Sequence, residues 1–255
     1  MELTDRDRAI YEWQIWVNDF GESGQQKLKD STALVTRVGG LGGPLAQSLA
    51  AAGLGKLILA HGGNTKDSDL NRQILQTHDQ VGKPRIDSCR RKLMELNPRI
   101  DIETCGENVT EENVRRLVSG ADIVFDCAPL FEERLLLNRE CVRQKKPLVD
   151  AAMFEMEGQL TTIIPGQTPC LACLYPEVPP GWKREFPVLG AVSATMANLA
   201  ALEGLKLLAG FGELLTSKLL IFDARSMDFR KIAIAPRPGC PVCSLRPLPA
   251  DQGHP

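Results

Sequence analysis

A glycine-rich turn at residues 37–43, RVGGLGG, constrains the fold of this chain more than any other feature. The turn follows the apolar run ALVT and precedes PLAQSLAAAG, which has helical spacing. A strand that turns tightly into a helix needs glycines for the bend, for close approach of the backbone to a ligand and for packing of the helix on the strand. Gly39, Gly40 and Gly42 fill such positions, whereas Arg37 stands at the first one. The free N–H groups at the helix start predict a site for the phosphates of a nucleotide.

Short apolar runs alternate with helical patterns through the first 155 residues. The runs that predict strands buried on both faces are TALVTRV (32–38), KLILA (56–60), ADIVFDC (121–127) and PLVDAAM (147–153). Helical spacing lies between them, at 44–53, 84–97, 111–120 and 133–144. Because helices between buried strands require right-handed crossovers, we expect an α/β fold with a Rossmann-like, mostly parallel sheet and helices on both faces.

The pattern changes after residue 155. GQLTTIIPG and KLLIFDARSMDFRKIAIAP alternate polar and apolar residues, which predicts an antiparallel C-terminal extension of the sheet. Between them, residues 193–212 have helical spacing and end at glycines. We expect a single domain over residues 1–245 and a flexible tail over 246–255.

Eight cysteines divide into two close pairs and four single residues. The pairs are C-x-x-C motifs in loops that contain proline, made by Cys170, Cys173, Cys240 and Cys243. Two such motifs supply four thiolates for a tetrahedral Zn²⁺ site, and four protein ligands leave no open position, so the zinc would be structural. Two redox-active or disulfide-bonded pairs are the alternative. The single cysteines are expected as core residues, and only Cys127 lies where a function is plausible.

Composition excludes two classes of partner. The formal net charge is −2 with 24% charged residues, so there is no excess of basic groups for binding nucleic acid or an anionic membrane. The N-terminus is charged and lacks the pattern of a signal peptide, and the longest apolar stretch, 189–212, carries Glu203 and Lys206. We therefore expect no membrane span and a cytoplasmic protein.

Further motifs resemble those of one family over nearly the whole chain, from about Tyr11 to Cys243. They are FGESGQQKLKDSTALV, VGGLGG, DLNRQIL, VGKPR, LNP, DIVFDC, MEGQLTTI, LEGLKLLAG and the two C-x-x-C motifs. The chain resembles the ThiF/MoeB/HesA family, relatives of the E1 enzymes that activate ubiquitin-like proteins, and it looks most like the HesA branch. That branch implies an accessory role in nitrogenase or other metal-cofactor assembly, such as that of the molybdenum cofactor.

The resemblance implies a homodimeric adenylyltransferase. In the family, ATP and Mg²⁺ bind at the glycine turn, and the C-terminal carboxylate of a small ubiquitin-like carrier protein attacks the α-phosphate and expels pyrophosphate. Such a displacement depends on cationic groups around the phosphates.

The resemblance also assigns roles to residues. The expected nucleotide-binding residues lie in the turn, after the second strand, and in the DLNRQ and VGKPR motifs: Gly39, Gly40, Gly42, His61, Asn71, Arg72, Gln73 and Arg85. Arg72 and Gln73 match the family's phosphate-contacting pair, and Arg85 supplies a cation where the family usually has lysine. Arg72 and Asp126 are the residues expected to act in catalysis.

Four positions depart from the family pattern. Arg37 replaces the first glycine, and His61 replaces an aspartate that holds the ribose. Trp13 stands where the family has an arginine, which often reaches a neighbouring subunit. Pro129 occupies the fourth position of the D-C-x-D motif, whose aspartate binds Mg²⁺ in the family, and proline has no side-chain ligand.

Two segments near these departures bear on the chemistry. Glu132 and Glu133 could supply a displaced carboxylate for the metal, or they could be ordinary residues at a helix start, stabilised by its dipole. The Pro-rich loop around Trp182 and Arg184 is either a surface for partner or substrate, or a cover over the site. Because the segment 174–192 contains no cysteine, no covalent transfer through it is expected.

Two functions of different classes therefore stay open. The first is an ATP-dependent adenylyltransferase with a rearranged site, acting on a small sulfur-carrier-type protein or a metal oxyanion. The second is a nucleotide- or metal-binding scaffold without catalysis. The joint presence of Arg72, Gln73 and the glycine turn favours the enzyme, although a fold alone does not establish an activity.

Overall fold

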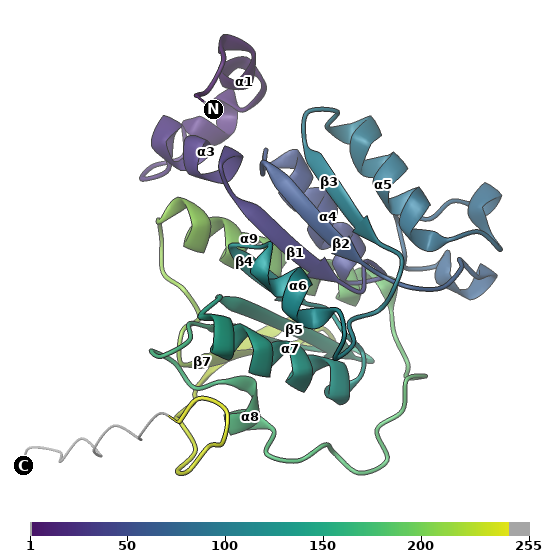
Figure 1. Ribbon diagram of the computed structural model, residues 1–255, viewed down its shortest axis with the longest axis vertical. Helices are drawn as coiled ribbons and strands as arrows, with labels where there is room; N and C mark the ends of the chain where they lie inside the picture. The colour runs from purple at the N-terminus through teal and green to yellow at the C-terminus, as the bar shows by residue number, and fades with distance from the viewer. Residues whose placement is uncertain (1, 245–255) are drawn as a thin grey trace, which may run out of the picture.

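One sheet of eight strands organises the computed structural model, which describes residues 2–244 (Figure 1). Five strands run parallel: β3 (Asp101–Cys105), β2 (Lys56–Ala60), β1 (Thr32–Thr36), β4 (Ile123–Asp126) and β5 (Leu148–Phe154). Three antiparallel strands continue the sheet from β5: β6 (Glu157–Ile163), β7 (Lys218–Asp223) and β8 (Asp228–Ala233). The Rossmann-like sheet with an antiparallel C-terminal extension is thus confirmed.

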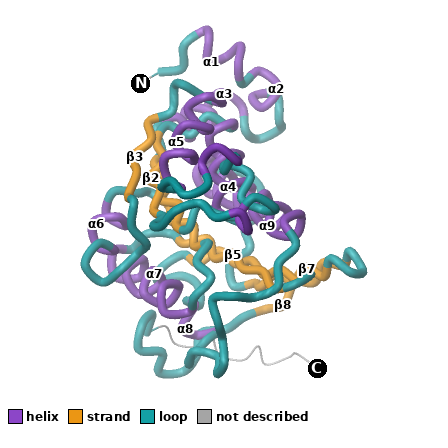
Figure 2. Tube along the Cα trace, turned by 90° about the vertical axis from the view of Figure 1, so that its right-hand side faces the viewer, coloured by secondary structure: helices purple, strands orange, loops and turns teal. Residues whose placement is uncertain are grey.

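Helices cover both faces of the sheet (Figures 1 and 2). One hydrophobic cluster joins the sheet to α3 (Gly21–Lys29), α4 (Gly42–Ala51), α5 (Arg85–Leu96) and α9 (Gly190–Ala209). A second cluster joins the opposite face to α6 (Val114–Ser119), α7 (Phe131–Gln144) and α8 (Leu171–Leu174). The inner strands are buried between the two clusters, which explains their continuous apolar sequences. Two short helices, α1 (Asp5–Ile10) and α2 (Glu12–Ile15), precede α3.

The long helix α9 packs very closely on the centre of the sheet. A Cβ atom at Gly204 would lie 2.2 Å from the ring of Phe125 in β4, so glycine is needed for this approach. The helix ends at Gly210, whose φ of 78° is left-handed. Glu203 is buried in α9 and ion-paired with Lys206, so the charges that interrupt the apolar stretch neutralise each other. Within residues 2–244, no helix combines the length and hydrophobicity needed to cross a membrane.

Several element boundaries differ from the sequence-based expectation. β3 was not predicted, because only Ile102 of its five residues is buried in this edge strand. The predicted helix at 111–120 begins at Val114, since the Asn113 side chain accepts a hydrogen bond from the Thr110 N–H at 2.9 Å and holds the preceding residues in a turn. The predicted strand at 32–38 ends at residue 36, where the chain turns into the glycine loop. α9 begins at residue 190 rather than 193. The predicted tail at 246–255 lies outside the described residues.

Candidate functional site

A cavity of about 370 Å³ lies at the carboxyl ends of the parallel strands. Its walls come from the glycine turn after β1, from His61 after β2, from residues 127–129 after β4 and from β5. The chain runs outward from β1 to β2 and β3 and then returns to β4, which lies on the other side of β1. The direction of winding reverses between β1 and β4, and open α/β sheets bind ligands at such a point.

The glycine turn approaches its neighbours closely at two positions, and at one of them, Gly42, it leaves no room for a side chain. A Cβ atom at Gly42 would lie 2.6 Å from the Arg37 carbonyl oxygen, so the turn could not close around it. A Cβ atom at Gly40 would lie 3.1 Å from Cγ of Arg72 and 3.3 Å from Oγ of Ser193. Just before α4, the backbone of the turn therefore lies directly against the side chains of Arg72 and Ser193.

Arg37 fits at the first position of the turn because its backbone adopts the left-handed region, with a φ of 53°. Its side chain reaches across to α7, where Nε and Nη2 lie 2.7 and 2.6 Å from Oε2 of Glu133. The side chains are 10% and 6% exposed, so this is a nearly buried ion pair. Glu132, in contrast, is exposed. Of the two glutamates, Glu133 is thus the one that faces inward, where its carboxylate is bound to Arg37 and does not line the cavity.

Asp69 collects the polar side chains opposite the turn. This buried carboxylate, in the 3₁₀ helix Asp67–Asp69, accepts a hydrogen bond from Gln73 Nε2 at 2.7 Å. Arg72 and Arg85 each lie 3.3 Å from it. Gln73 Oε1 in turn accepts from Arg85 Nη1 at 3.2 Å. The structure therefore brings Arg72, Gln73 and Arg85 together, and all three line the cavity. Asn71 is exposed and binds the Arg72 guanidinium at 3.0 Å instead of lining the cavity.

His61 lies at the end of β2 with its ring facing the turn. Burial, and then the charges of Arg85 and Arg37, lower its pKa to about 3. The ring is therefore neutral at pH 7. A hydrogen bond joins it to the backbone of Val38, while Nδ1 is buried without a partner among the described residues. A neutral imidazole with an unoccupied nitrogen can accept a hydrogen bond from a ligand hydroxyl.

Asp126 lies behind the cavity rather than in its wall. It is fully buried at the end of β4, and its Oδ1 accepts a hydrogen bond from the Ala128 N–H at 2.9 Å. Burial, and then the nearby Asp150, raise the pKa of Asp126 well above its usual range. Arg134 of α7 separates the two carboxylates, at 2.9 Å from Asp150 and 3.7 Å from Asp126. Only Arg134 of these three reaches the cavity.

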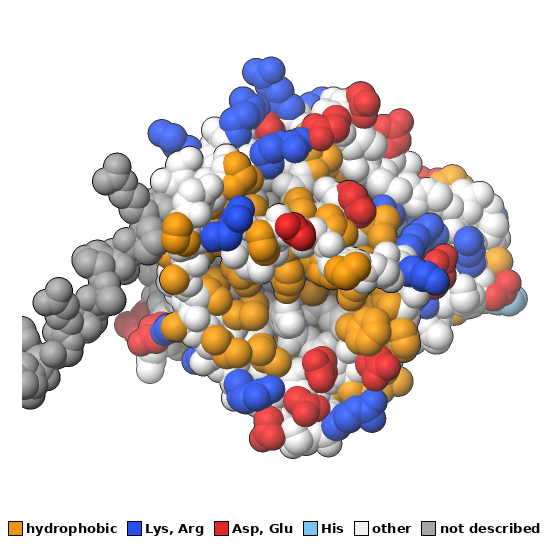
Figure 3. All heavy atoms as spheres, turned by 90° about the horizontal axis from the view of Figure 1, so that it is seen from below, with side chains coloured by type: hydrophobic (Ala, Val, Ile, Leu, Met, Phe, Trp, Pro, Cys, Tyr) orange, Lys and Arg blue, Asp and Glu red, His pale blue; other side chains and the backbone are white. Residues whose placement is uncertain are grey.

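The Pro-rich loop covers the cavity. Trp182 donates its indole N–H to the Pro129 carbonyl oxygen at 2.7 Å and packs edge-on against Phe131 at 5.3 Å between ring centroids. Phe186 packs on Trp182 at 5.9 Å, and Arg184 lines the cavity. Figure 3, which views the face formed by α8 and this loop, shows hydrophobic side chains gathered at its centre with charged groups around them. Of the two interpretations of this loop, the structure agrees with a cover over the cavity.

Sequence reasoning missed three contributors to the site: Asp69, Arg134 and Ser193. Ser193 is fully buried in the first turn of α9, lines the cavity, and has no hydrogen-bond partner for Oγ among the described residues. An unpaired buried hydroxyl costs free energy unless a ligand or water satisfies it. Its only signal in the sequence was a serine within an otherwise apolar helix start.

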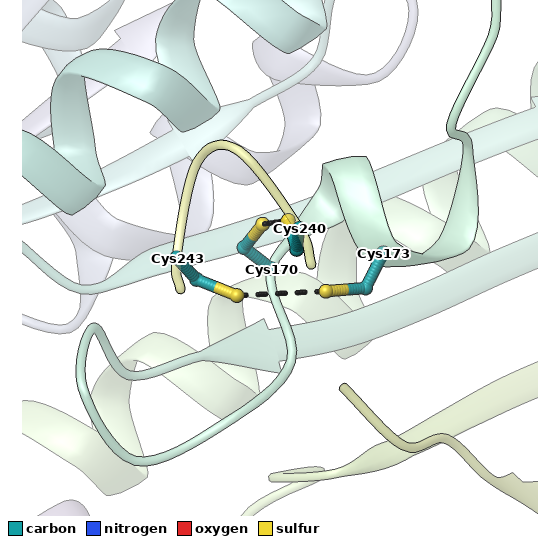
Figure 4. A group of neighbouring side chains, drawn as sticks. All are labelled: Cys170, Cys173, Cys240 and Cys243. Atoms are coloured by element: carbon teal, nitrogen blue, oxygen red, sulfur yellow. Dashed lines mark hydrogen bonds between the residues drawn. The ribbon is translucent and has the colours of Figure 1, made fainter. Parts of the chain in front are cut away.

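The four predicted zinc ligands form one cluster (Figure 4). Their sulfur atoms lie within 4.8 Å of one another, with Cys170 and Cys240 at 3.7 Å and Cys173 and Cys243 at 3.5 Å. A tetrahedral Zn²⁺ with Zn–S bonds of about 2.3 Å would separate its sulfurs by about 3.8 Å, so the residues fit this metal. Cys127 lines the cavity, but burial raises its pKa well above the ordinary thiol value, and it is not an activated nucleophile.

Trp13 is the remaining position singled out in the sequence. Its side chain is 81% exposed on α2 and stacks on Trp16, which is 66% exposed. Trp13 does not line the cavity of its own chain. A large exposed aromatic pair is typical of an interaction surface.

The fold and the cavity define an α/β protein in which a glycine turn, a neutral histidine and a set of arginines face one another. The model of the ThiF family matches residues 11–242. The chain belongs to the ThiF family.

Relatives agree with this assignment. The chain is 51% identical over 243 residues to "Protein HesA, heterocyst" of Trichormus variabilis, covering 95% of this chain and 91% of the relative. It is 41% identical to "Adenylyltransferase and sulfurtransferase MOCS3" of Drosophila yakuba, covering 97% of this chain and 56% of that protein. The predicted likeness to the HesA branch is therefore confirmed, and the family includes proteins named as adenylyltransferases.

Solved structures share the fold. The crystal structure of E. coli MccB with AMPCPP and MccA superposes with a TM-score of 0.83 at 22% identity, over 95% of this chain and 75% of that chain. The structure of MccB with ATP gives a TM-score of 0.79 over 95% of this chain and 74% of that chain, also at 22% identity.

Proposed function

We propose that this chain is an E1-like, ATP-dependent adenylyltransferase with a divergent active site. The observation that carries the proposal is the gathering of Arg72, Gln73 and Arg85 around Asp69, opposite the glycine turn in one cavity. Two acidic side chains line this cavity against six cationic ones: Arg37, Lys66, Arg72, Arg85, Arg134 and Arg184. Such a surface favours a ligand with several negative charges, such as a triphosphate.

The proposed orientation of ATP follows from the residues that line the cavity. The triphosphate would lie at the N-terminus of α4, against the N–H groups of the turn, with Arg72 and Arg85 neutralising its charge. The unpaired Ser193 hydroxyl faces the same backbone and would donate to a phosphate oxygen. His61 would accept a hydrogen bond from a ribose hydroxyl at Nδ1, replacing the aspartate of the family.

In the proposed reaction, a carboxylate oxygen of the acceptor forms a bond to the α-phosphorus. The bond from this phosphorus to the bridging oxygen breaks, and pyrophosphate leaves with the electron pair. Arg72 is the proposed catalytic residue, because it touches the turn where the phosphates would lie. Asp126 is proposed as a positioning residue, since it shapes the loop after β4 through Ala128 without reaching the cavity.

The proposed acceptor is the C-terminus of a small ubiquitin-like sulfur carrier or a related protein of cofactor assembly, with a metal oxyanion such as molybdate as a variant. Support comes from the likeness to HesA and from the name of MOCS3. Nitrogenase or molybdenum-cofactor assembly is the proposed setting. A homodimer is also proposed, and the exposed Trp13–Trp16 pair offers apolar surface for it.

Structural zinc at the four cysteines is part of the proposal. The four sulfurs already lie at separations close to those of a tetrahedral site, on α8 and on a loop close to the C-terminus. Zinc would tie these two distant segments together and would add folding free energy. Reduced thiolates of this kind suit the cytoplasm, which is the proposed location.

A calorimetric titration with ATP, followed by ATP–pyrophosphate exchange with candidate carrier proteins and molybdate, tests the function. We expect ATP binding and exchange that depends on an acceptor. Arg72→Ala should abolish both, whereas Arg116→Ala, which removes an exposed arginine of α6, should leave both unchanged. Unchanged affinity in Arg72→Ala would contradict the assigned role.

A non-catalytic nucleotide-binding scaffold is the second candidate. It is favoured by Pro129, which removes a metal ligand of the family, and by the ion pair between Arg37 of the turn and Glu133 of α7. ATP binding without pyrophosphate exchange, for every acceptor tested, would select the scaffold.

A further inference from the structure

The resemblance implies Mg²⁺ bound by the protein at this site, but the residues do not fit such an ion. Proteins hold Mg²⁺ through one or two carboxylates together with substrate phosphates. Pro129 stands at the position of the family's ligand. Two carboxylates line the cavity, and one of them, Asp69, already has both oxygens engaged by polar partners. The other, Glu185, lies on the exposed covering loop.

Arg37 brings a cation to the edge of the turn instead. Two of its nitrogens, Nε and Nη2, contact the same Glu133 oxygen at 2.7 and 2.6 Å. Arg37 lines the cavity and Glu133 does not, so the cationic partner of the pair is the one that borders the cavity. Nη1 is not engaged by any residue in the part of the chain that the structure describes. A planar guanidinium held along one edge keeps N–H donors for a phosphate on the other.

Glu133 also fixes the position of the Arg37 guanidinium. An unanchored arginine at the first position of the turn could fold over the N–H groups and occupy the phosphate position. Glu133 lies on the first turn of α7, a regular helix, and draws the Arg37 side chain toward that helix. The pair therefore holds the Arg37 guanidinium beside α7, at the border of the cavity.

We propose that Arg37, anchored by Glu133, takes the place of the protein-bound divalent cation, so that this chain binds the triphosphate of ATP without needing Mg²⁺. The inference rests on the proposed nucleotide-binding function. It deepens that function, because it names the form of the nucleotide that the site accepts: free ATP as well as its magnesium complex.

Calorimetric titrations with ATP in excess Mg²⁺ and in excess EDTA test the proposal. The full chain should bind ATP in both buffers, with affinities within about threefold of each other, because the guanidinium does not depend on the metal. Arg37→Gly/Glu133→Gln removes the pair without leaving a buried charge, and glycine suits the left-handed backbone. This double variant should lose at least about tenfold in affinity in EDTA, the worth of a charge-assisted hydrogen bond. Arg139→Ala/Glu111→Gln, which removes an exposed pair, is the matched control and should match the wild type.

A variant whose ATP binding should come to depend on Mg²⁺ provides a second test. Adding Pro129→Asp to the double variant restores a carboxylate at the family's metal position, and binding should then be strong in Mg²⁺ and weak in EDTA. Binding by the wild type that EDTA abolishes would overturn the inference and leave the nucleotide function standing. Loss of Mg²⁺-dependent binding in Glu185→Gln would place the ion on the covering loop and would also overturn it. No ATP binding in either buffer would overturn both the inference and the proposed function.

Discussion

Replacing Arg37 with glycine should destabilise the fold, even though glycine is the residue that suits its backbone. The change removes the cation from an ion pair whose side chains are 10% and 6% exposed, which leaves the Glu133 carboxylate without its partner. Breaking such a pair from one side costs about 3–5 kcal/mol. Glycine at a φ of 53° relieves a left-handed strain of about 1–2 kcal/mol. The net loss should therefore be about 1–4 kcal/mol, with a central value of about 2.5 kcal/mol.

Urea denaturation of four proteins measures this loss: the wild type, Arg37→Gly, Glu133→Gln and the double variant. Arg37→Gly should lower the midpoint by about 1 M, given a slope of about 2–3 kcal/mol per M. The double variant should lie within about 1 kcal/mol of the wild type, because no charge is left unpaired. A double variant whose loss equals the sum of the two single losses would refute the reasoning, since the two side chains would then not interact.

Three further predictions concern other parts of the structure. Elemental analysis of the purified protein should find zinc. A strong chelator, or the substitution Cys173→Ser, should lower the melting temperature of the protein. Metal-free protein with an unchanged melting temperature would exclude a structural role for zinc. The pKa of His61, about 3 in the fold, lies below its ordinary value of 6.5, so protonation favours the unfolded chain. Its contribution to stability is complete above pH 6.5 and is lost as the pH falls toward 3, by at most about 1.4 kcal/mol per pH unit. His61→Gln should remove that part of the slope in denaturation series over this range, and equal slopes would show that His61 is protonated in the fold. Gly40→Ala should weaken ATP binding by about tenfold with little loss of stability, because the new methyl group lies 3.1 Å from Cγ of Arg72. Gly106→Ala, whose added methyl group has nothing within 4 Å, is the control. Equal ATP affinities in the two variants would contradict the close approach of the turn to Arg72.

The sequence was informative where neighbouring residues determine the structure. The strands at 56–60 and 147–153 were recognised from continuous apolar runs, because both faces of these strands are covered by helices. β3 was missed for the opposite reason: it lies at the sheet edge, and DIETC has a single buried residue. Periodicity cannot reveal a strand whose side chains are mostly exposed.

The site shows the same division. Arg72, Gln73 and Arg85 lie in the DLNRQIL and VGKPR motifs. Asp69, the carboxylate that joins them, is the first residue of DLNRQIL, but nothing in the sequence indicated that it holds the other three side chains. The partner of Arg37 could not be found from the sequence, since Glu133 lies 96 residues further along the chain. Glu132 and Glu133 are equivalent in the sequence, and only the orientation of α7 turns one inward and leaves the other exposed. Contacts of this kind depend on how the helices pack on the sheet.

A crystal structure with AMPCPP, a non-hydrolysable analogue of ATP, would test the central claim most directly. We predict that the triphosphate lies against the N–H groups of Gly39 to Gly42, within hydrogen-bond distance of Arg72, while Arg37 remains on Glu133. Electron density showing the Arg37 guanidinium over those N–H groups, with no phosphate in the cavity at saturating nucleotide, would contradict the account.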